Sequence, residues 1–340
     1  MGAGSSFEPV DWIWRDGEFV PWDDARLHLL STAVQFGTSV FEGIRAYETK
    51  RGPAIFRLDA HIRRLFDSAR IYRMVPDYTL ENVSAVCKEI VVKNGLTDCY
   101  IRPMILRGFG APGLNPLNSP IETYVPAWSW GTYLGEGALA GGVDVCVSSW
   151  QRAEPNTFPS RAKAGGQYVN AQLMKMEAIA NGYTDAIALG PGGLVSEGTG
   201  MNLFLVRDGV LITPVLDGTS LVGITRGAVI QMAEDLGYEV SNEPVPRESL
   251  YTADEIFFTG TAAEVTPVRS VDRIAVGTGK TGPITLALQK QFLQTVRGQI
   301  DDPHGYLTYV HDDAQDDEVR QPRRAAAVGQ APAFRARSTT

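Results

Sequence analysis

Apolar and polar residues alternate with more than one period along the chain, and these periods predict both strands and helices. Residues 12–22 are rich in aromatic and β-branched side chains on either side of Asp16-Gly17, a pair that favours a tight hairpin turn. Apolar residues then recur at helical spacing over 62–72, and we expect Asp59 to be the N-cap of that helix. The same spacing over 80–91 predicts a second helix.

Two β-rich runs follow, and we expect each to form one strand. They cover 99–106 and 121–128, and the second closes a first folded unit near residue 133. The next segment, 134–141, is rich in glycine and is the best candidate for a linker. Strict alternation of apolar residues from Val143 onward then predicts the first strand of a second unit.

The second unit again mixes strands with helices, without a strict alternation of the two. Helical spacing predicts helices over about 168–181, 225–236 and 283–296. Hairpins are expected at Gly190-Pro-Gly-Gly and at Asp208-Gly209. The chain as a whole is therefore expected to have an α+β fold.

These patterns predict four segments. A small N-terminal domain covers 1–133, the linker covers 134–141, and a larger domain covers 142–312. The remaining residues, 313–340, have few large apolar side chains to bury and are expected to be disordered.

Composition narrows the possible functions. The formal net charge of −8 argues against nucleic acid as a partner, so any anion site must be local. The three cysteines are widely spaced and lack zinc-ligand spacing, and the four histidines show none either, so we predict no disulfide framework and no metal site. We find no signal-peptide pattern and no uncharged stretch of about 18 residues, which predicts a soluble cytoplasmic protein without a membrane partner.

Lys163 is the first candidate for chemistry. It lies among alanines and is followed by two glycines, so a flat ligand could approach the backbone closely. A lysine that is poorly solvated favours its neutral, nucleophilic amine, which imine formation requires. From this segment alone, a lysine in a solvated loop remains an open alternative.

Two segments offer backbone N–H groups to an anion. Residues 221–226 lead directly into a predicted helix, so the N–H groups of Ile224 and Thr225 should point out of its N-terminus, where phosphate binds well. Residues 259–264 join a strand to a turn of small residues and add the hydroxyl of Thr261. Each could equally be an ordinary capped turn.

Glu197 is a single carboxylate among small residues between a glycine turn and an apolar strand. It could pair with a buried cation, although a carboxylate that caps a turn would have the same pattern. The nearby glycines fit neither the dinucleotide-binding nor the P-loop spacing, and the chain has no serine elbow for a hydrolase.

Taken together, these segments resemble the fold-type IV enzymes that use pyridoxal 5'-phosphate (PLP), and specifically the branched-chain amino-acid aminotransferases. The resemblance extends from about residue 11 to about residue 307. Six runs occur in that family's order: 36–45, 100–103, 162–166, 196–200, 223–226 and 260–264. It implies a small N-terminal α/β domain and a larger, β-barrel-like C-terminal domain with helices.

The resemblance also implies roles for the cofactor site. Lys163 would form the Schiff base with PLP and move the proton, Glu197 would pair with the ring nitrogen, and Tyr168 would hydrogen-bond the phenolic oxygen. The phosphate would be held by Arg64, Ile224, Thr225 and Thr261.

For the substrate it implies an apolar cage and a carboxylate site. The cage would consist of Phe41, Trp130 and Tyr133. The α-carboxylate would bind Tyr100 and the N–H groups of Thr261 and Ala262, while Arg102 would support Tyr100 and accept the distal carboxylate of glutamate.

The implied reaction moves the amino group of leucine, isoleucine or valine to 2-oxoglutarate, in a homodimer or a higher homo-oligomer whose sites are completed by a neighbouring subunit. One departure concerns Phe36, which stands where these enzymes usually carry a tyrosine, and Met201 replaces a commonly polar residue. We therefore hypothesise that primary (R)-amines are accepted as well. A D-amino-acid or (R)-amine transaminase of the same fold is the alternative, and a non-catalytic PLP-binding protein is the alternative of another class.

Overall fold

The strands of this computed structural model, which describes residues 9–110, 112–131, 134 and 137–311, form three sheets. The first has the order β2-β1-β8-β7-β3. Its strands are β1 (Trp12–Arg15), β2 (Glu18–Pro21), β3 (Ser39–Phe41), β7 (Met104–Arg107) and β8 (Ile121–Val125). The second has the order β19-β5-β4-β6-β9. Its strands are β4 (Ile44–Thr49), β5 (Gly52–Phe56), β6 (Cys99–Ile101), β9 (Ala127–Ser129) and β19 (Leu307–Tyr309).

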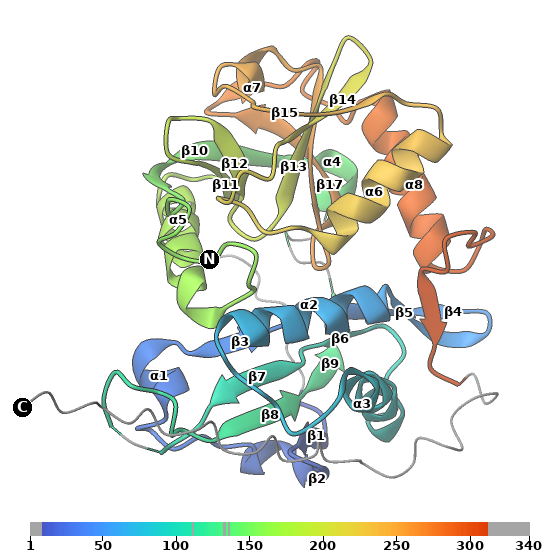
Figure 1. Cartoon of the computed structure of the whole chain (residues 1–340). Coiled ribbons are helices and arrows are strands. Elements are labelled where there is room, and N and C mark those ends of the chain that lie inside the picture. Colours follow the sequence, from blue (N-terminus) through green and yellow to red (C-terminus); the bar gives the residue numbers. More distant parts are fainter. Residues whose placement is uncertain (1–8, 111, 132–133, 135–136, 312–340) are drawn as a thin grey trace, which may run out of the picture.

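The third sheet, called here the large sheet, has the order β12-β11-β10-β17-β16-β13-β14-β15, with β18 paired to β17. Its strands are β10 (Val143–Gln151), β11 (Asp185–Leu189), β12 (Val195–Gly198), β13 (Asn202–Arg207), β14 (Val210–Pro214), β15 (Val240–Glu243), β16 (Glu255–Gly260), β17 (Glu264–Val271) and β18 (Ile274–Ala275). It mixes parallel and antiparallel pairs and is strongly curled in Figure 1. The predicted α+β fold is confirmed.

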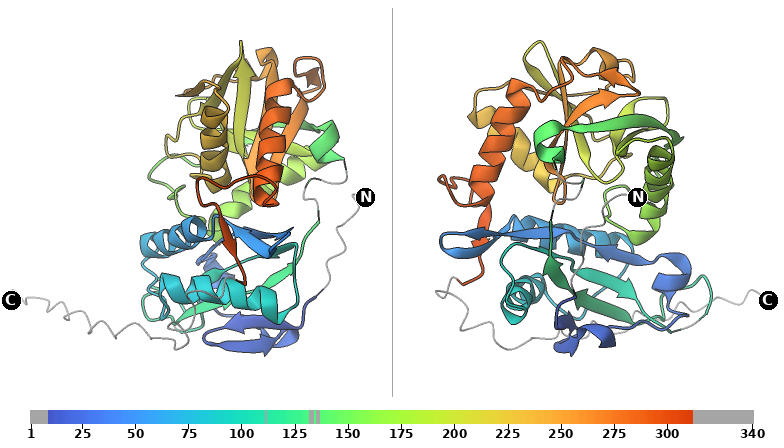
Figure 2. Two further views of the ribbon diagram at one scale, coloured as in Figure 1. Left: turned by 90° about the vertical axis from the view of Figure 1, so that its right-hand side faces the viewer. Right: turned by 180° about the vertical axis from the view of Figure 1, so that it is seen from behind.

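Eight α-helices and two short 3-10 helices connect the strands in the part of the chain that is described. They are η1 (Trp22–Asp24), α1 (Thr32–Phe36), α2 (Leu58–Ile71), α3 (Leu80–Lys93), α4 (Ala138–Gly141), η2 (Gly165–Gln167), α5 (Tyr168–Ala180), α6 (Ile224–Asp235), α7 (Ser249–Thr252) and α8 (Pro283–Val296). Figure 1 shows α2 crossing between the two smaller sheets and the large sheet. In the two views of Figure 2, β19 returns from the end of α8 to lie beside β5, with which it pairs.

The predicted hairpins and the longer helices are confirmed. The turn at Asp16-Gly17 takes positive φ angles of 43° and 99°, and hairpins also form at 190–193 and at Asp208-Gly209. One detail of α2 was wrong, because the helix begins at Leu58 and Asp59 lies within its first turn. A carboxylate there still interacts favourably with the helix N-terminus, without capping it.

The two runs that were each expected to form one strand are both divided. The first is β6 and β7, interrupted at Arg102-Pro103, and the second is β8 and β9, interrupted at Pro126. Proline has no N–H group to donate to a ladder, and at each break the chain passes from one small sheet to the other. The breaks therefore leave Arg102 between the two sheets, with its N–H donated to Pro126 O at 2.9 Å.

Apolar packing joins the smaller sheets to the large one. Tyr47 of β4 and Phe56 of β5 belong to the same buried cluster as Phe204 and Phe257 of the large sheet. Phe56 also packs edge-on against Phe292 of α8, with ring centroids 5.4 Å apart. Burial of each such side chain contributes about 1.5–3 kcal/mol, so these contacts fix the sheets relative to one another.

The division of the chain into domains stays a prediction. Residues 138–141 of the expected linker form α4, whereas 132–133, 135–136 and the tail from 312 onward, including the expected disordered segment 313–340, lie outside the described residues.

Candidate functional site

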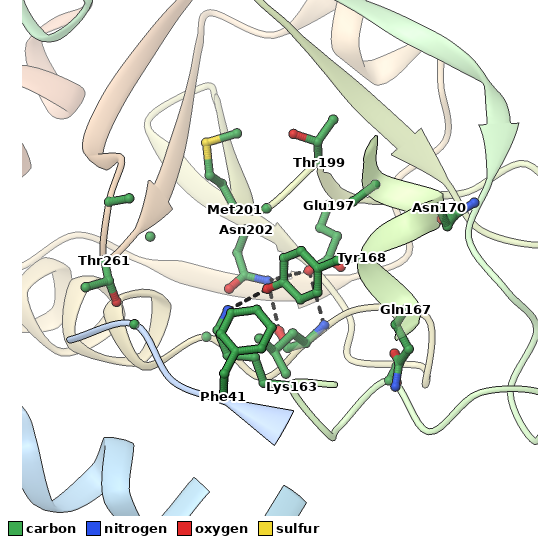
Figure 3. Close-up of a pocket in the computed structure, with 18 of the residues that line it drawn as sticks. Phe41, Lys163, Gln167, Tyr168, Asn170, Glu197, Thr199, Met201, Asn202 and Thr261 are labelled. Atoms are coloured by element: carbon green, nitrogen blue, oxygen red, sulfur yellow. Dashed lines mark hydrogen bonds between the residues drawn. The ribbon is translucent and has the colours of Figure 1, made fainter. Parts of the chain in front are cut away.

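A cavity of about 640 Å³ lies between α2 and the smaller sheets on one side and the large sheet on the other. Most of the predicted site residues line it. They are Phe41, Arg64, Tyr100, Arg102, Trp130, Lys163, Tyr168, Glu197, Ile224, Thr225, Thr261 and Ala262. Residues that lie far apart in the sequence are thus brought to one place, and Figure 3 shows how several of them face one another.

The backbone around Lys163 is fixed on both sides. Its N–H donates to Ser68 Oγ at 3.0 Å, and its carbonyl accepts the N–H of Phe41 at 3.0 Å. The two glycines that follow pack against residues 37–39, because an added Cβ at Gly165 would lie 2.4 Å from Ser39 Oγ. The small residues that sequence analysis singled out thus allow a close approach of two backbone segments.

The amine of Lys163 is half-buried and oriented by its neighbours. Nζ donates to the hydroxyl of Tyr168 at 2.5 Å and lies 5.0 Å from the ring centroids of both Tyr168 and Phe41 (Figure 3). Lys163 thus lies in a loop, as the alternative interpretation has it, but its amine is held between two rings at the cavity wall.

Glu197 lies on β12, is 7% exposed and has partners on both oxygens. Oε1 accepts from Arg152 Nη2 at 2.7 Å, and Oε2 accepts the Leu221 N–H at 3.1 Å and Asn202 Nδ2 at 3.3 Å. Burial raises the pKa of this carboxyl, against the opposing effects of Arg152, the Leu221 N–H and Lys163. Burial thus opposes the ionised form of Glu197, and the guanidinium of Arg152 favours it.

Arg152 was missed by the sequence analysis. Its guanidinium also donates to the carbonyls of Gly198 and Thr199, at 3.2 and 3.3 Å, so it braces the turn that follows Glu197. It comes directly after β10, and no local pattern around it indicates a partner 45 residues away.

Arg64 of α2 is held by a buried carboxylate that the sequence analysis also missed. Its Nε and Nη2 donate to the two oxygens of Glu42 at 2.6 and 2.8 Å, and its Nη1 donates to Val222 O at 2.8 Å. Burial alone would raise the pKa of the Glu42 carboxyl, but Arg64 and His61 hold that pKa well below its usual range. The pair fixes a cation immediately before the N-terminus of α6.

That helix N-terminus is open toward the cavity. Gly223 occupies the N-cap position and no side chain caps the helix there, while Ile224 and Thr225 line the cavity. An added Cβ at Gly223 would lie 1.8 Å from Asn202 Oδ1, so any other residue here would displace the side chain of Asn202. Free N–H groups beside a fixed guanidinium are suited to a phosphate group.

The other end of the cavity has an aromatic wall with one cation. The guanidinium carbon of Arg102 lies 4.9 Å from the ring centroid of Phe41 and 5.1 Å from that of Tyr100, and Trp130 packs 4.8 Å from Tyr100. The hydroxyl of Tyr100 packs against Gly43, where an added Cβ would lie 1.7 Å away. An apolar group and an anion could both bind this wall.

Two predicted residues are not part of this arrangement. Phe36 is the last residue of α1, is 48% exposed and does not line the cavity of the single chain. Tyr133 lies outside the described residues.

The donor set fits PLP. A phosphate would meet Arg64 and the start of α6, a protonated ring nitrogen would meet a buried carboxylate, and an aldehyde would meet the lysine amine. Among the described residues, no three His, Cys, Asp or Glu side chains gather as metal ligands, and no helix is long and apolar enough to cross a membrane.

Comparison with known proteins gives the same assignment. A family model described as amino-transferase class IV matches residues 39–271. The branched-chain-amino-acid aminotransferase of Escherichia coli (strain K12) is 48% identical over 303 residues, which cover 89% of this chain and 98% of that protein. A branched-chain amino acid aminotransferase from T.th., solved with pyridoxamine 5'-phosphate, superposes with a TM-score of 0.86 and 49% identity, covering 89% of this chain and 99% of that one. The same protein complexed with N-(5'-phosphopyridoxyl)-L-glutamate gives a TM-score of 0.85 and 47% identity, with the same coverage.

Proposed function

The chain belongs to the class IV aminotransferases, within the family of branched-chain-amino-acid aminotransferases and with their fold-type IV architecture, and we propose its reaction on this basis. In the proposed reaction, the chain transfers the amino group of leucine, isoleucine and valine to 2-oxoglutarate through a Schiff base between Lys163 and PLP. The observation that carries this proposal is that one cavity brings together a lysine amine, a buried carboxylate and a helix N-terminus suited to a phosphate group.

PLP, when bound, supplies an aldehyde that takes up the amino group and a ring that stabilises negative charge at the substrate Cα. The chain supplies the groups around it. Arg64, the N–H groups of Ile224 and Thr225, and the hydroxyl of Thr261 would hold the phosphate. Glu197, which is paired with Arg152, would accept a hydrogen bond from the ring nitrogen.

Lys163 is proposed to move the proton at the substrate Cα. Tyr168 holds its amine at the cavity wall, which limits the lysine to positions from which it can reach a bound substrate. Proton transfer by a positioned group typically contributes about 10²- to 10⁴-fold in rate.

We propose that the aromatic wall of the cavity binds the two kinds of substrate in turn. Phe41 and Trp130 offer apolar surface to a branched aliphatic side chain, and the Arg102 guanidinium offers a charge to the distal carboxylate of glutamate. Tyr100 and the N–H groups of Thr261 and Ala262 are proposed to take the α-carboxylate that both substrates share.

A second copy of the chain is proposed to complete the site. Exposed apolar side chains gather in the segments beside Phe36, and Leu29, Leu114 and Leu117 are 76%, 87% and 63% exposed. Surfaces of this kind mark interfaces between proteins. A homodimer would cover them and would allow Phe36 to contribute to the substrate pocket of its partner. The cytoplasmic location stays a prediction.

The Phe36 position motivates the second candidate, relaxed activity on primary (R)-amines. The family usually has a tyrosine here, and its absence removes a hydroxyl from the carboxylate side of the pocket. We propose a panel of amino donors, with leucine, a D-amino acid and an (R)-amine, tested against 2-oxoglutarate and pyruvate on the wild type and on Phe36→Tyr. Leucine turnover supports the main proposal. If Phe36→Tyr loses more activity on the amine than on leucine, the role of residue 36 is supported. If the wild type does not turn over the amine, the relaxed activity is excluded.

A further inference from the structure

The hairpin between β16 and β17 has an unusual residue at its end. Gly260 pairs with Glu264, which leaves 261–263 as a three-residue loop. Such loops usually end with a residue in the left-handed conformation, and that residue is normally glycine. Here it is Glu264, at φ 54°. The left-handed conformation is unfavourable for a glutamate, so contacts elsewhere in the molecule must stabilise it here.

The carboxylate of Glu264 is buried and reaches a different sheet. Its Oε1 accepts from Arg45 Nη1 and from the hydroxyl of Tyr47, both at 3.0 Å. Arg45 and Tyr47 belong to β4, and the side chains of Arg45 and Glu264 are each 8% exposed. The Arg45 guanidinium carbon also lies 4.8 Å from the ring centroid of Tyr47. The three side chains form what we call the Glu264 cluster.

The same loop forms part of the cavity wall. Gly260, Thr261 and Ala262 line the cavity, and Ala263 is buried behind them. The carbonyl of Ala263 accepts from the hydroxyl of Thr266 at 2.6 Å. The loop is therefore anchored at its C-terminal end, next to the residues that line the cavity.

We propose that Glu264 is a positioning residue for carboxylate substrates, and this rests on the function proposed above. Through Arg45 and Tyr47 it ties the loop to β4, so that the N–H groups of Thr261 and Ala262 keep one orientation toward the α-carboxylate. Glycine would satisfy the backbone better, but it would leave the loop without this tie. Fixed donors bind a carboxylate better than donors that must first be ordered.

The test is Glu264→Gly in the PLP-loaded enzyme, since this change removes the carboxylate and relieves the positive φ. The measurements are KM and kcat for leucine, the Kd of 4-methylpentanoate and of PLP by visible absorption, and the melting temperature. Asp208→Gly is the matched control, because Asp208 has φ 50° in an exposed hairpin and does not line the cavity. Glu264→Gln, which keeps an acceptor oxygen, is the conservative variant.

Loss of one ordered hydrogen bond to a charged group lowers an affinity at least about tenfold. We therefore expect Glu264→Gly to raise KM for leucine and Kd for 4-methylpentanoate about tenfold or more. The values of kcat and PLP affinity should stay close to the wild type, the melting temperature should fall because the buried Arg45 loses its partner, and Glu264→Gln should recover part of the loss in carboxylate binding. Wild-type carboxylate binding in Glu264→Gly would overturn the proposal, as would an equal loss of PLP and carboxylate affinity. If the wild type transaminates no leucine, the proposed function fails, while the 4-methylpentanoate titration still decides the role of Glu264.

Discussion

The sharpest prediction concerns Arg152, the cation that pairs with the buried Glu197. Arg152→Gln removes the donor 2.7 Å from Oε1 and leaves the carboxylate with the N–H of Leu221 and the amide of Asn202. Removing one partner of a buried ion pair typically costs about 3–5 kcal/mol, because the other charge remains buried. We expect a loss of unfolding free energy of this size in the cofactor-free protein at pH 8.

The loss should depend on pH with a definite sign. Burial already raises the pKa of Glu197 in the folded state, and without Arg152 the pKa rises further. A carboxyl with a raised folded-state pKa gains a proton on folding, so its contribution to stability falls as the pH rises from the unfolded value toward the folded one. At pH 5.5 the variant can protonate Glu197 and avoid part of the cost. Each unit of pKa shift corresponds to about 1.36 kcal/mol, so the variant should recover about 1–3 kcal/mol relative to pH 8.

The assay is thermal unfolding of cofactor-free wild type and variant at pH 5.5 and 8.0, with PLP affinity measured at pH 8. Arg269→Gln is the control, because its partner Asp144 is a surface carboxylate whose pKa is lowered to about 2, first by the hydrogen bond from Arg269, and so does not titrate in this range. Exposed pairs of this kind contribute about 0–1 kcal/mol. An Arg152→Gln stability deficit that is the same at both pH values, or PLP binding as tight as in the wild type, would show that Arg152 does not hold the charge of Glu197.

Three further variants probe other contacts. Tyr168→Phe removes the hydroxyl 2.5 Å from Lys163 Nζ and should lower kcat for leucine about tenfold to a hundredfold at unchanged PLP content, whereas an unchanged kcat would contradict the role of the hydroxyl. Glu42→Gln removes the charge that fixes Arg64, the proposed phosphate ligand, and should raise the Kd of PLP at least about tenfold in a titration of cofactor-free protein; an unaltered Kd would be evidence against that role. Gly282→Ala places a Cβ 2.1 Å from Glu255 Cδ, where that carboxylate caps α8, and should cost about 1–3 kcal/mol in thermal unfolding; an unchanged melting temperature would show that the cap can shift.

Much of the fold follows from local patterns. Helical spacing predicted α3, α5, α6 and α8, and turn residues predicted the hairpins. The two divided strands had a visible signal in Pro103 and Pro126, which a stricter use of the missing N–H group would have recognised. The N-cap of α2 was misplaced because aspartate is common both at the N-cap and within the first turn of a helix, where Asp59 lies.

The site residues also divide into those that a local sequence pattern indicates and those that none indicates. Lys163 and Glu197 lie in short runs with a recognisable composition, so they could be singled out as candidates from the sequence. Their partners could not, because Arg152 reaches across 45 residues and Glu42 reaches Arg64 across 22. Such pairs depend on how strands and helices pack, and no short segment of sequence carries that information.

The proposed attachment of PLP to Lys163 can be tested by chemical reduction of the imine. The purified PLP-loaded protein is reduced with borohydride, digested, and its peptides are analysed by mass spectrometry, with Lys163→Ala treated in parallel. We expect loss of the visible absorption band and a phosphopyridoxyl group on the peptide that contains Lys163, with no such label in the variant. A label on any other lysine, or full transamination by Lys163→Ala, would contradict it.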